Sequence, residues 1–170
     1  MRLLGSGAIL PEVRAAARLL KEDFGIEAEV WSVTSFTELH KDGLRAERER
    51  MRRLVTGNSG EIGQDPLPPW VSTCFGNSDA PVIATTDYVR AVPELIRAQI
   101  TARYVTLGTD GFGRSDTRAG LRRFFEIDKH WIVFQALATL AGTGAVAPEV
   151  PGQAAQRYAI LFPQLPPWQR

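Results

Sequence analysis

The sequence predicts an α/β domain with a largely parallel sheet between two layers of helices. Three observations predict it. Short strand-like apolar runs recur along the chain, helical patterns alternate with them, and small or polar residues follow each run. At 170 residues the chain is long enough to bury a core without disulfides. We expect this domain at residues 1–144, followed at residues 145–170 by a proline-rich tail with one short helix.

The first strand and the first helix are predicted near the amino terminus. Residues 1–4 form the expected strand, which the glycines of residues 5–7 end. Over residues 11–24 apolar side chains repeat at intervals of three and four, as on the buried face of a helix. Pro11 suits the first turn of this helix, and Gly25 suits its carboxyl-terminal end.

A second strand is predicted at residues 29–33, and it leads into a helix. Ser35 and Glu38 follow the strand with the spacing of a capping box, so a short helix is expected from Phe36, with Gly43 interrupting the pattern. Residues 44–54 are highly charged and predict a solvated helix or an ordered loop. A nucleic-acid-binding helix is the alternative, but glutamates alternate with its arginines.

The rest of the chain continues the alternation. Residues 56–79 are irregular and rich in proline and glycine. Further strands are expected at residues 82–85 and 104–107. Further helices are expected at residues 93–100, 117–125, 129–141 and 153–160. Ser115 or Asp116 would cap the helix at 117–125, and Asp128 would cap the helix at 129–141.

Composition narrows the classes of function. The 20 basic and 19 acidic residues nearly balance, so nucleic acid and anionic membranes are not expected partners. No apolar run reaches the ~18 residues of a membrane span. The single cysteine, Cys74, suits a reducing cytosol, and the two histidines, His40 and His130, lie too far apart in sequence to suggest a metal site. We therefore expect a cytoplasmic protein.

The candidate site residues follow the strands, because the carboxyl ends of parallel strands share one edge of a sheet. Two interpretations of the glycine-rich loop at residues 108–116 stay open. Its glycines and Arg114 suit a phosphorylated or anionic small molecule, whereas Asp110 and Asp116 oppose an anion and suit a structural or interface role. The candidates are Thr34, Ser35, Asp87, Asp110, Gly111, Phe112, Gly113, Arg114 and Asp116.

Four stretches carry a resemblance to a known family. They are LLGSGAILPEVRAAARLL from Leu3, VWSVTSFTELHKDG from Val30, TTDYVR from Thr85 and YVTLGTDGFGRSDTRAGLRRFFEID from Tyr104. In order and spacing they resemble the C-terminal domain of the homodimeric pyruvate dehydrogenase decarboxylating component, over about residues 1–144. The resemblance implies a transketolase-type C-terminal domain: a three-layer α/β/α sandwich around a five-stranded, mostly parallel mixed sheet with one antiparallel strand.

The resemblance also implies a function for the parent enzyme. Such an enzyme decarboxylates pyruvate on thiamine diphosphate with Mg²⁺ and acetylates the lipoyl group of the dihydrolipoyl acetyltransferase. Because the family holds the cofactor between its other two domains, no catalytic, cofactor or metal residue is expected here. The expected partners are the remaining domains, the second subunit of a homodimer and the acetyltransferase, through dimer assembly, the active-site entrance or partner contact. The alternative is a free-standing module that binds an anion at the strand-end loops.

Overall fold

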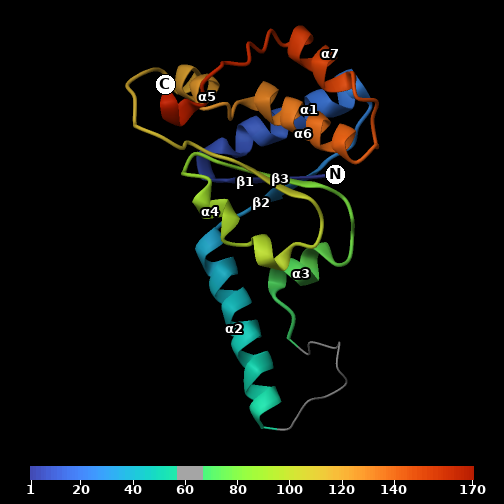
Figure 1. Ribbon diagram of the computed structural model, residues 1–170, viewed down its shortest axis with the longest axis vertical. Helices are drawn as coiled ribbons and strands as arrows, with labels where there is room; N and C mark the ends of the chain where they lie inside the picture. The colour runs from blue at the N-terminus through green and yellow to red at the C-terminus, as the bar shows by residue number, and fades with distance from the viewer. Residues whose placement is uncertain (57–66) are drawn as a thin grey trace.

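The computed structural model describes residues 1–56 and 67–170, and in them a sheet lies between two layers of helices (Figure 1). The sheet has four strands in the order β2-β1-β3-β4, and every pair is parallel. The strands are β1 (Arg2–Ser6), β2 (Glu29–Ser32), β3 (Val82–Thr86) and β4 (Tyr104–Leu107). All four predicted strands and the three-layer α/β/α class are therefore confirmed.

One detail of the expected sheet is wrong for the described residues. The resemblance implies five strands with one antiparallel, and the described ranges contain four parallel strands. The chain after β4 forms helices and turns, and its last 26 residues include five prolines, which cannot donate a backbone hydrogen bond to a neighbouring strand. Strands β2 and β4 are consequently the two edges of the sheet.

The layer above the sheet in Figure 1 contains α1 (Leu10–Phe24), α5 (Arg118–Phe124), α6 (Lys129–Gly142) and α7 (Val150–Arg157). Leu3 of β1 and Ile83 of β3 point into this layer and are fully buried. The predicted stop of α1 is confirmed, because Gly25 takes the left-handed conformation with φ 67°. The helix packing here buries α6 on most of its surface, as its largely apolar sequence predicts.

The layer on the other face contains α2 (Phe36–Val55), α3 (Trp70–Phe75) and α4 (Ala91–Glu94). Leu4 of β1 and Val82 of β3 point into it, because successive side chains of a strand face opposite sides of the sheet. Helix α3 lies within the segment predicted to be irregular, and residues 57–66 of that segment lie outside the described residues.

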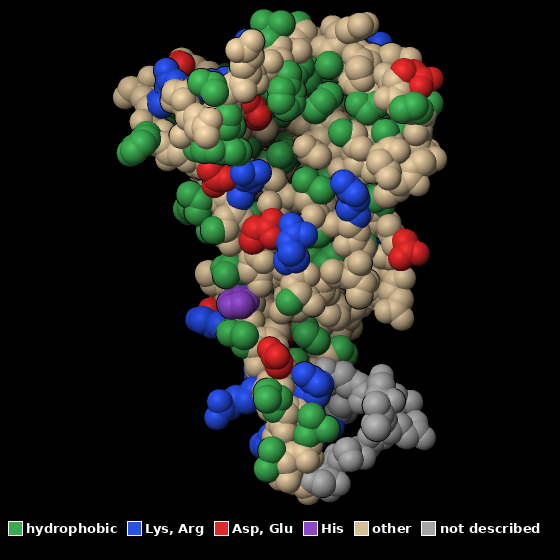
Figure 2. Space-filling model, in the orientation of Figure 1, with side chains coloured by type: hydrophobic (Ala, Val, Ile, Leu, Met, Phe, Trp, Pro, Cys, Tyr) green, Lys and Arg blue, Asp and Glu red, His purple; other side chains and the backbone are tan. Residues whose placement is uncertain are grey.

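Helix α2 is longer than predicted and is not interrupted. It runs for 20 residues, so the expected interruption at Gly43 is wrong. Gly43 is buried, and a Cβ there would lie 2.3 Å from Nε2 of Gln99, so the glycine allows close packing inside a continuous helix. Only half of the predicted capping box appears: Ser35 Oγ accepts from the Glu38 N–H at 3.2 Å, while the Glu38 carboxylate pairs with Lys41. The predicted solvated helix at residues 44–54 is confirmed, and Figure 2 shows its charged side chains facing solvent.

Three predicted helix boundaries also need correction. The segment predicted as one helix at 93–100 divides into α4 and a 3-10 turn (Arg97–Gln99), and Pro93 fits in the first turn of α4, where an N–H has no helical partner. Helix α5 is capped by Thr117, whose Oγ accepts from Gly120 at 3.1 Å, rather than by Ser115 or Asp116. The predicted helix at 153–160 begins earlier, as α7, because Pro151 suits its first turn.

The carboxyl-terminal segment folds back onto the body of the domain. Helix α7 is fastened to α1, because Tyr158 donates to the Asp23 carboxylate at 2.6 Å and Arg157 pairs with the same group. The last residues reach α5, where Arg170 donates to Glu126 at 2.8 Å and to the Phe124 carbonyl at 3.1 Å. Within the described ranges no helix is both long enough and apolar enough to cross a lipid bilayer.

The cap of α6 gives a test of the fold. Both Oδ1 contacts of Asp128, to the N–H groups of His130 and Trp131 at 3.0 Å, satisfy donors that the helix leaves unpaired. We expect Asp128→Ala to lower the free energy of unfolding by about 1 kcal/mol, measured by urea denaturation. Asp128→Asn keeps an acceptor and should retain most of the stability; equal losses in the two variants would contradict the cap.

Candidate functional site

The loops after β3 and β4 are joined to each other at the carboxyl edge of the sheet. The Thr109 N–H donates to the Tyr88 carbonyl at 2.8 Å, and Thr109 Oγ1 donates to the Asp87 carbonyl at 3.0 Å. Gly108 permits this approach, because a Cβ at that position would lie 2.6 Å from the Tyr88 oxygen. The two loops therefore form one continuous surface.

An ion pair holds the same two loops together. Arg90 donates from its backbone N–H to Asp110 at 2.9 Å and from its guanidinium to the same carboxylate at 2.5 Å. The guanidinium carbon of Arg90 also lies 5.0 Å from the centre of the Trp168 ring, a cation–π contact with the carboxyl-terminal segment. Asp110 thus joins the loop after β4 to the loop after β3 through Arg90.

A buried arginine, Arg122, joins the loop after β3 to the start of α1. Its guanidinium donates to the Ala8 carbonyl at 2.6 Å, to Glu12 at 3.2 Å and to Asp87 at 3.3 Å. The second carboxylate oxygen of Glu12 accepts from the Lys129 N–H at 3.0 Å. One guanidinium therefore fixes the start of α1 and the loop after β3, and Glu12 extends the link to the start of α6.

Sequence reasoning placed Asp87 at this edge but missed its partner Arg122. Arg122 is one of several arginines in α5, and nothing local distinguishes it from exposed Arg118. Its burial depends on Glu12 and Asp87, which lie 110 and 35 residues away in the chain. A contact of that sequence separation leaves no periodic signal.

The remaining candidates of this edge lie at residues 111–116, in the second part of the glycine-rich loop. Gly111 has φ 112° and lies directly against the carboxyl-terminal segment, since a Cβ there would be 2.8 Å from the Trp168 Cα. Phe112 is 91% exposed, and around Gly113 the space is open. Asp116 accepts from the Thr117 N–H at 2.6 Å.

Arg114 bears on the alternative of an anion site. Its guanidinium carbon lies 4.1 Å from the centre of the Phe124 ring, on α5. The side chain is therefore used in a stacking contact, and neither Asp110 nor Asp116 is its partner at ion-pair distance in the described residues. An anion site at this loop stays a prediction that no contact of the structure favours.

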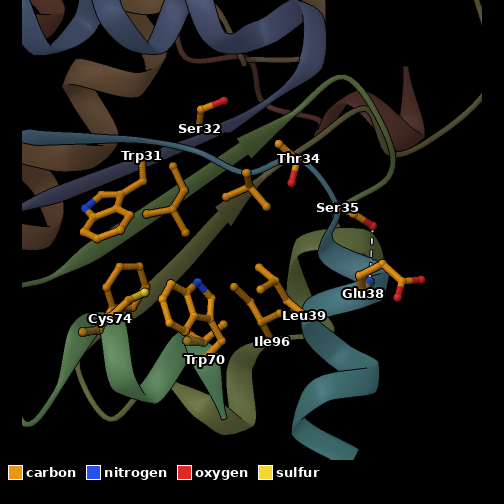
Figure 3. Close-up of a pocket in the computed structure, with 13 residues that line it drawn as sticks. Trp31, Ser32, Thr34, Ser35, Glu38, Leu39, Trp70, Cys74 and Ile96 are labelled. Carbon is orange, nitrogen blue, oxygen red and sulfur yellow. Dashed lines mark hydrogen bonds between the residues drawn. The ribbon is translucent and has the colours of Figure 1, made fainter.

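Thr34 and Ser35 belong to a different feature, the groove between α2 and α3 beneath β2 (Figure 3). This groove has a volume of about 340 Å³ and an apolar lining. Figure 3 shows Trp31 pointing from β2 toward Cys74 and Trp70 on α3, with Thr34 and Ser35 at one end. The main apolar lining residues are Trp31, Val33, Leu39, Trp70, Phe75 and Ile96.

The structure therefore divides the predicted candidates into two groups. Asp87, Asp110 and the loop at 111–116 follow β3 and β4, which are neighbours. Thr34 and Ser35 follow β2 at the opposite edge of the sheet, three strand spacings or roughly 14 Å from β4. Both groups lie at the carboxyl ends of parallel strands, but they are too far apart to form one site.

Among the described residues, the reactive or metal-binding side chains are not grouped together. Burial raises the pKa of the Cys74 thiol, which disfavours the nucleophilic thiolate. His40 contacts the Leu95 carbonyl through Nδ1 at 2.8 Å, and His130 stacks on Tyr158 with ring centres 4.7 Å apart. Within residues 1–56 and 67–170 no three His, Cys, Asp or Glu side chains are grouped as metal ligands.

The Asp87 and Asp110 carboxylates do not fit a Mg²⁺–diphosphate group. Asp87 is bound to Arg122 and Asp110 to Arg90, so guanidinium groups already engage the oxygens that would coordinate the metal. What the edge presents instead is a set of large apolar side chains around the Arg90–Asp110 pair. We call this the carboxyl-edge surface, and it consists of Tyr88, Val89, Phe112 and Trp168.

Comparison with known proteins identifies the family of the chain. The family model described as the transketolase-like TK C-terminal domain matches residues 1–128. The chain is 50% identical over 161 residues to the pyruvate dehydrogenase E1 component of Pseudomonas aeruginosa, which covers 94% of this chain and 17% of the relative. Proteins of the same name from Cupriavidus necator and Escherichia coli K12 are 45% and 41% identical over 160 and 161 residues, again 94% of this chain and 17% of each relative. The chain thus spans about a sixth of the length of these relatives.

Removing the Arg122 guanidinium should destabilise the domain. Arg122→Met leaves the part-buried carboxylates of Glu12 and Asp87 without their cation, which we expect to cost about 3 kcal/mol of unfolding free energy. Arg118→Met in the same helix is exposed and should change stability by no more than about 0.5 kcal/mol. Denaturant titration of both variants measures the difference, and similar losses would show that Arg122 is not the organising contact.

Gly111 offers a test of the contact between the loop and the carboxyl-terminal segment. Gly111→Ala introduces a Cβ against Trp168 at an unfavourable φ, so we expect a stability loss of about 1–3 kcal/mol and faster amide exchange in residues 163–170. Gly113→Ala, two residues away, adds a Cβ in open space and serves as the control. Unchanged exchange in Gly111→Ala would mean that the segment does not depend on this contact.

Proposed function

The chain belongs to the transketolase-like C-terminal domain family, and from that premise we propose that it is the C-terminal domain of a pyruvate dehydrogenase E1 component. The parent enzyme would decarboxylate pyruvate oxidatively on thiamine diphosphate with Mg²⁺ and acetylate the lipoyl group of the dihydrolipoyl acetyltransferase, in the cytoplasm. Identities of 41–50% over 94% of the chain support this proposal.

Within that enzyme we propose a non-catalytic role for this domain. The described residues supply no set of ligands that fits the metal and diphosphate, and the Asp87 and Asp110 carboxylates pair with Arg122 and Arg90. The cofactor would therefore be held by other parts of the enzyme. The role of this domain would be to assemble the homodimer, shape the active-site entrance or contact the acetyltransferase.

One observation carries this role: large apolar side chains are exposed on a firmly held loop pair. Tyr88 is 66% exposed and Phe112 91% exposed, although the backbone beneath them is fixed by hydrogen bonds and by Asp110. Clustered exposed apolar groups on a soluble domain mark contact surfaces, and aromatic side chains are enriched in protein interfaces. The carboxyl-edge surface is therefore the best candidate for the contact with another domain or subunit.

The internal pairing of charges suits such a contact. Arg90 and Asp110 already form an ion pair within the domain, so burying this surface in a contact leaves neither of these charges without a partner. Arg122 and Asp87 are paired in the same way below it. Thr34 and Ser35 follow β2, at the other end of the strand order, so they would contact a partner separately.

A chimeric enzyme tests the proposed function. We would replace the matching region of the Pseudomonas aeruginosa relative with this chain and measure pyruvate-dependent acetylation of a lipoyl substrate. The expected result is an active enzyme, whereas the same relative without this region should be inactive. The separate 170-residue chain should neither decarboxylate pyruvate nor bind thiamine diphosphate with Mg²⁺ in calorimetry. A folded but inactive chimera, or tight cofactor binding by the separate chain, would contradict the proposal.

A further inference from the structure

Helix α2 extends away from the sheet and carries apolar side chains on its outer face (Figures 1 and 2). Leu44, Met51 and Val55 are 50%, 57% and 88% exposed, and Leu54 is exposed beside them. The four residues have no role in either core of the domain. Leu54 lies eleven positions after the buried Gly43 and so on the same side of the helix as that glycine. We call the other three, Leu44, Met51 and Val55, the α2 stripe.

The spacing places these three side chains in line. Residues 44, 51 and 55 are separated by seven and four positions, so they fall on one face of an α-helix, with Arg48 between them. Ala46 and Gly43 are buried on a different side. One face of the helix therefore packs against the domain, and another face presents a line of apolar side chains to solvent.

The charges beside the stripe indicate the kind of surface that would cover it. Residues 44–55 include five arginines and two glutamates, a formal net charge of +3. Arg45 and Arg52 flank the stripe, and each has only one acidic partner on its own helix, Asp42 and Glu49. Arg48 has no ion-pair partner among the described residues. A covering surface that is apolar along its centre and acidic at its margins would match this pattern.

A second copy of the chain does not match it. Pairing two α2 helices in parallel would bring Arg48 against Arg48 at the centre of the contact. Antiparallel pairing of the stripes, with Leu44 opposite Val55, would bring Arg45 beside Arg52 of the other copy. Both arrangements place like charges together. A nucleic-acid surface matches no better, because apolar side chains occupy the centre of the face.

We propose that the α2 stripe docks onto an apolar surface with acidic margins in the remaining part of the same E1 polypeptide. This rests on the proposed function, because the relatives are about six times as long as the matched region and most of their chain lies outside it. The contact is separate from the carboxyl-edge surface, since α2 extends away from the sheet and from the strand ends that carry that surface (Figure 1).

The test compares the separate chain with the full-length chimera described above. Met51→Cys should react with a maleimide about tenfold more slowly in the chimera than in the separate chain, because docking covers residue 51. Peptide mass spectrometry distinguishes this thiol from Cys74. Equal labelling rates in an active chimera would overturn the docking while leaving the proposed function intact, whereas an inactive, folded chimera would count against the proposed function.

Substitutions at two positions of the face separate docking from folding. In the separate chain Met51→Glu should move the midpoint of thermal unfolding by no more than about 2 °C, because the side chain is exposed. In the chimera that carries Val55→Cys, Met51→Glu and Arg48→Glu should each raise the labelling rate of that thiol by about tenfold. Met51→Leu and Arg48→Lys conserve the chemistry and should leave that rate unchanged. If Met51→Glu weakens only the self-association of the chain, or only the binding of the acetyltransferase, then the stripe is not covered by the remaining part of the E1 polypeptide and the proposal is wrong.

Discussion

The carboxyl edge of the sheet depends on one buried guanidinium. Arg122 joins a carbonyl before α1, a carboxylate within α1 and a carboxylate after β3, and Glu12 passes the link to the first N–H of α6. A buried ion pair is not by itself a large source of stability, because desolvation opposes it. Its consequence here is geometric: three segments that the chain brings from distant positions must meet around one planar group with fixed donor directions.

A second arginine repeats this arrangement nearer the surface. Arg90 connects the loop after β3 to Asp110 after β4, and its other side lies on Trp168. The carboxyl-terminal segment and the glycine-rich loop are therefore held by the same side chain. With Arg114 stacked on Phe124, the arginines of this edge are committed to internal contacts. The large exposed side chains of the carboxyl-edge surface are apolar, and the Arg90 and Asp110 charges beside them form an ion pair. This suits a surface that meets another protein more than one that binds a charged metabolite.

The features that sequence predicted correctly are those with local causes. Each strand and the α1 stop at Gly25 follow from short patterns, and the Asp128 cap involves only His130 and Trp131, two and three positions further along the chain. The errors have non-local causes. Gly43 lies within a continuous helix, where Gln99 packs closely against it, and the partner of Asp110 is Arg90, 20 residues away in the chain. Arg122 was overlooked for the same reason. Local rules identify where a polar residue lies along an element, but its partner is set by the topology of the sheet.

The two exposed apolar surfaces differ in how their charges are arranged, and this difference separates their roles. On the carboxyl-edge surface the charges are paired within the domain, so any partner with a complementary apolar shape can approach without an electrostatic requirement. Beside the α2 stripe the arginines exceed the glutamates, so only a partner with acidic margins covers it without repulsion. A domain that docks through the α2 stripe keeps its carboxyl-edge surface accessible for a second contact. Because α2 extends away from the sheet, whereas Tyr88 and Phe112 lie on the loops after β3 and β4, the two surfaces are separate parts of one domain (Figure 1).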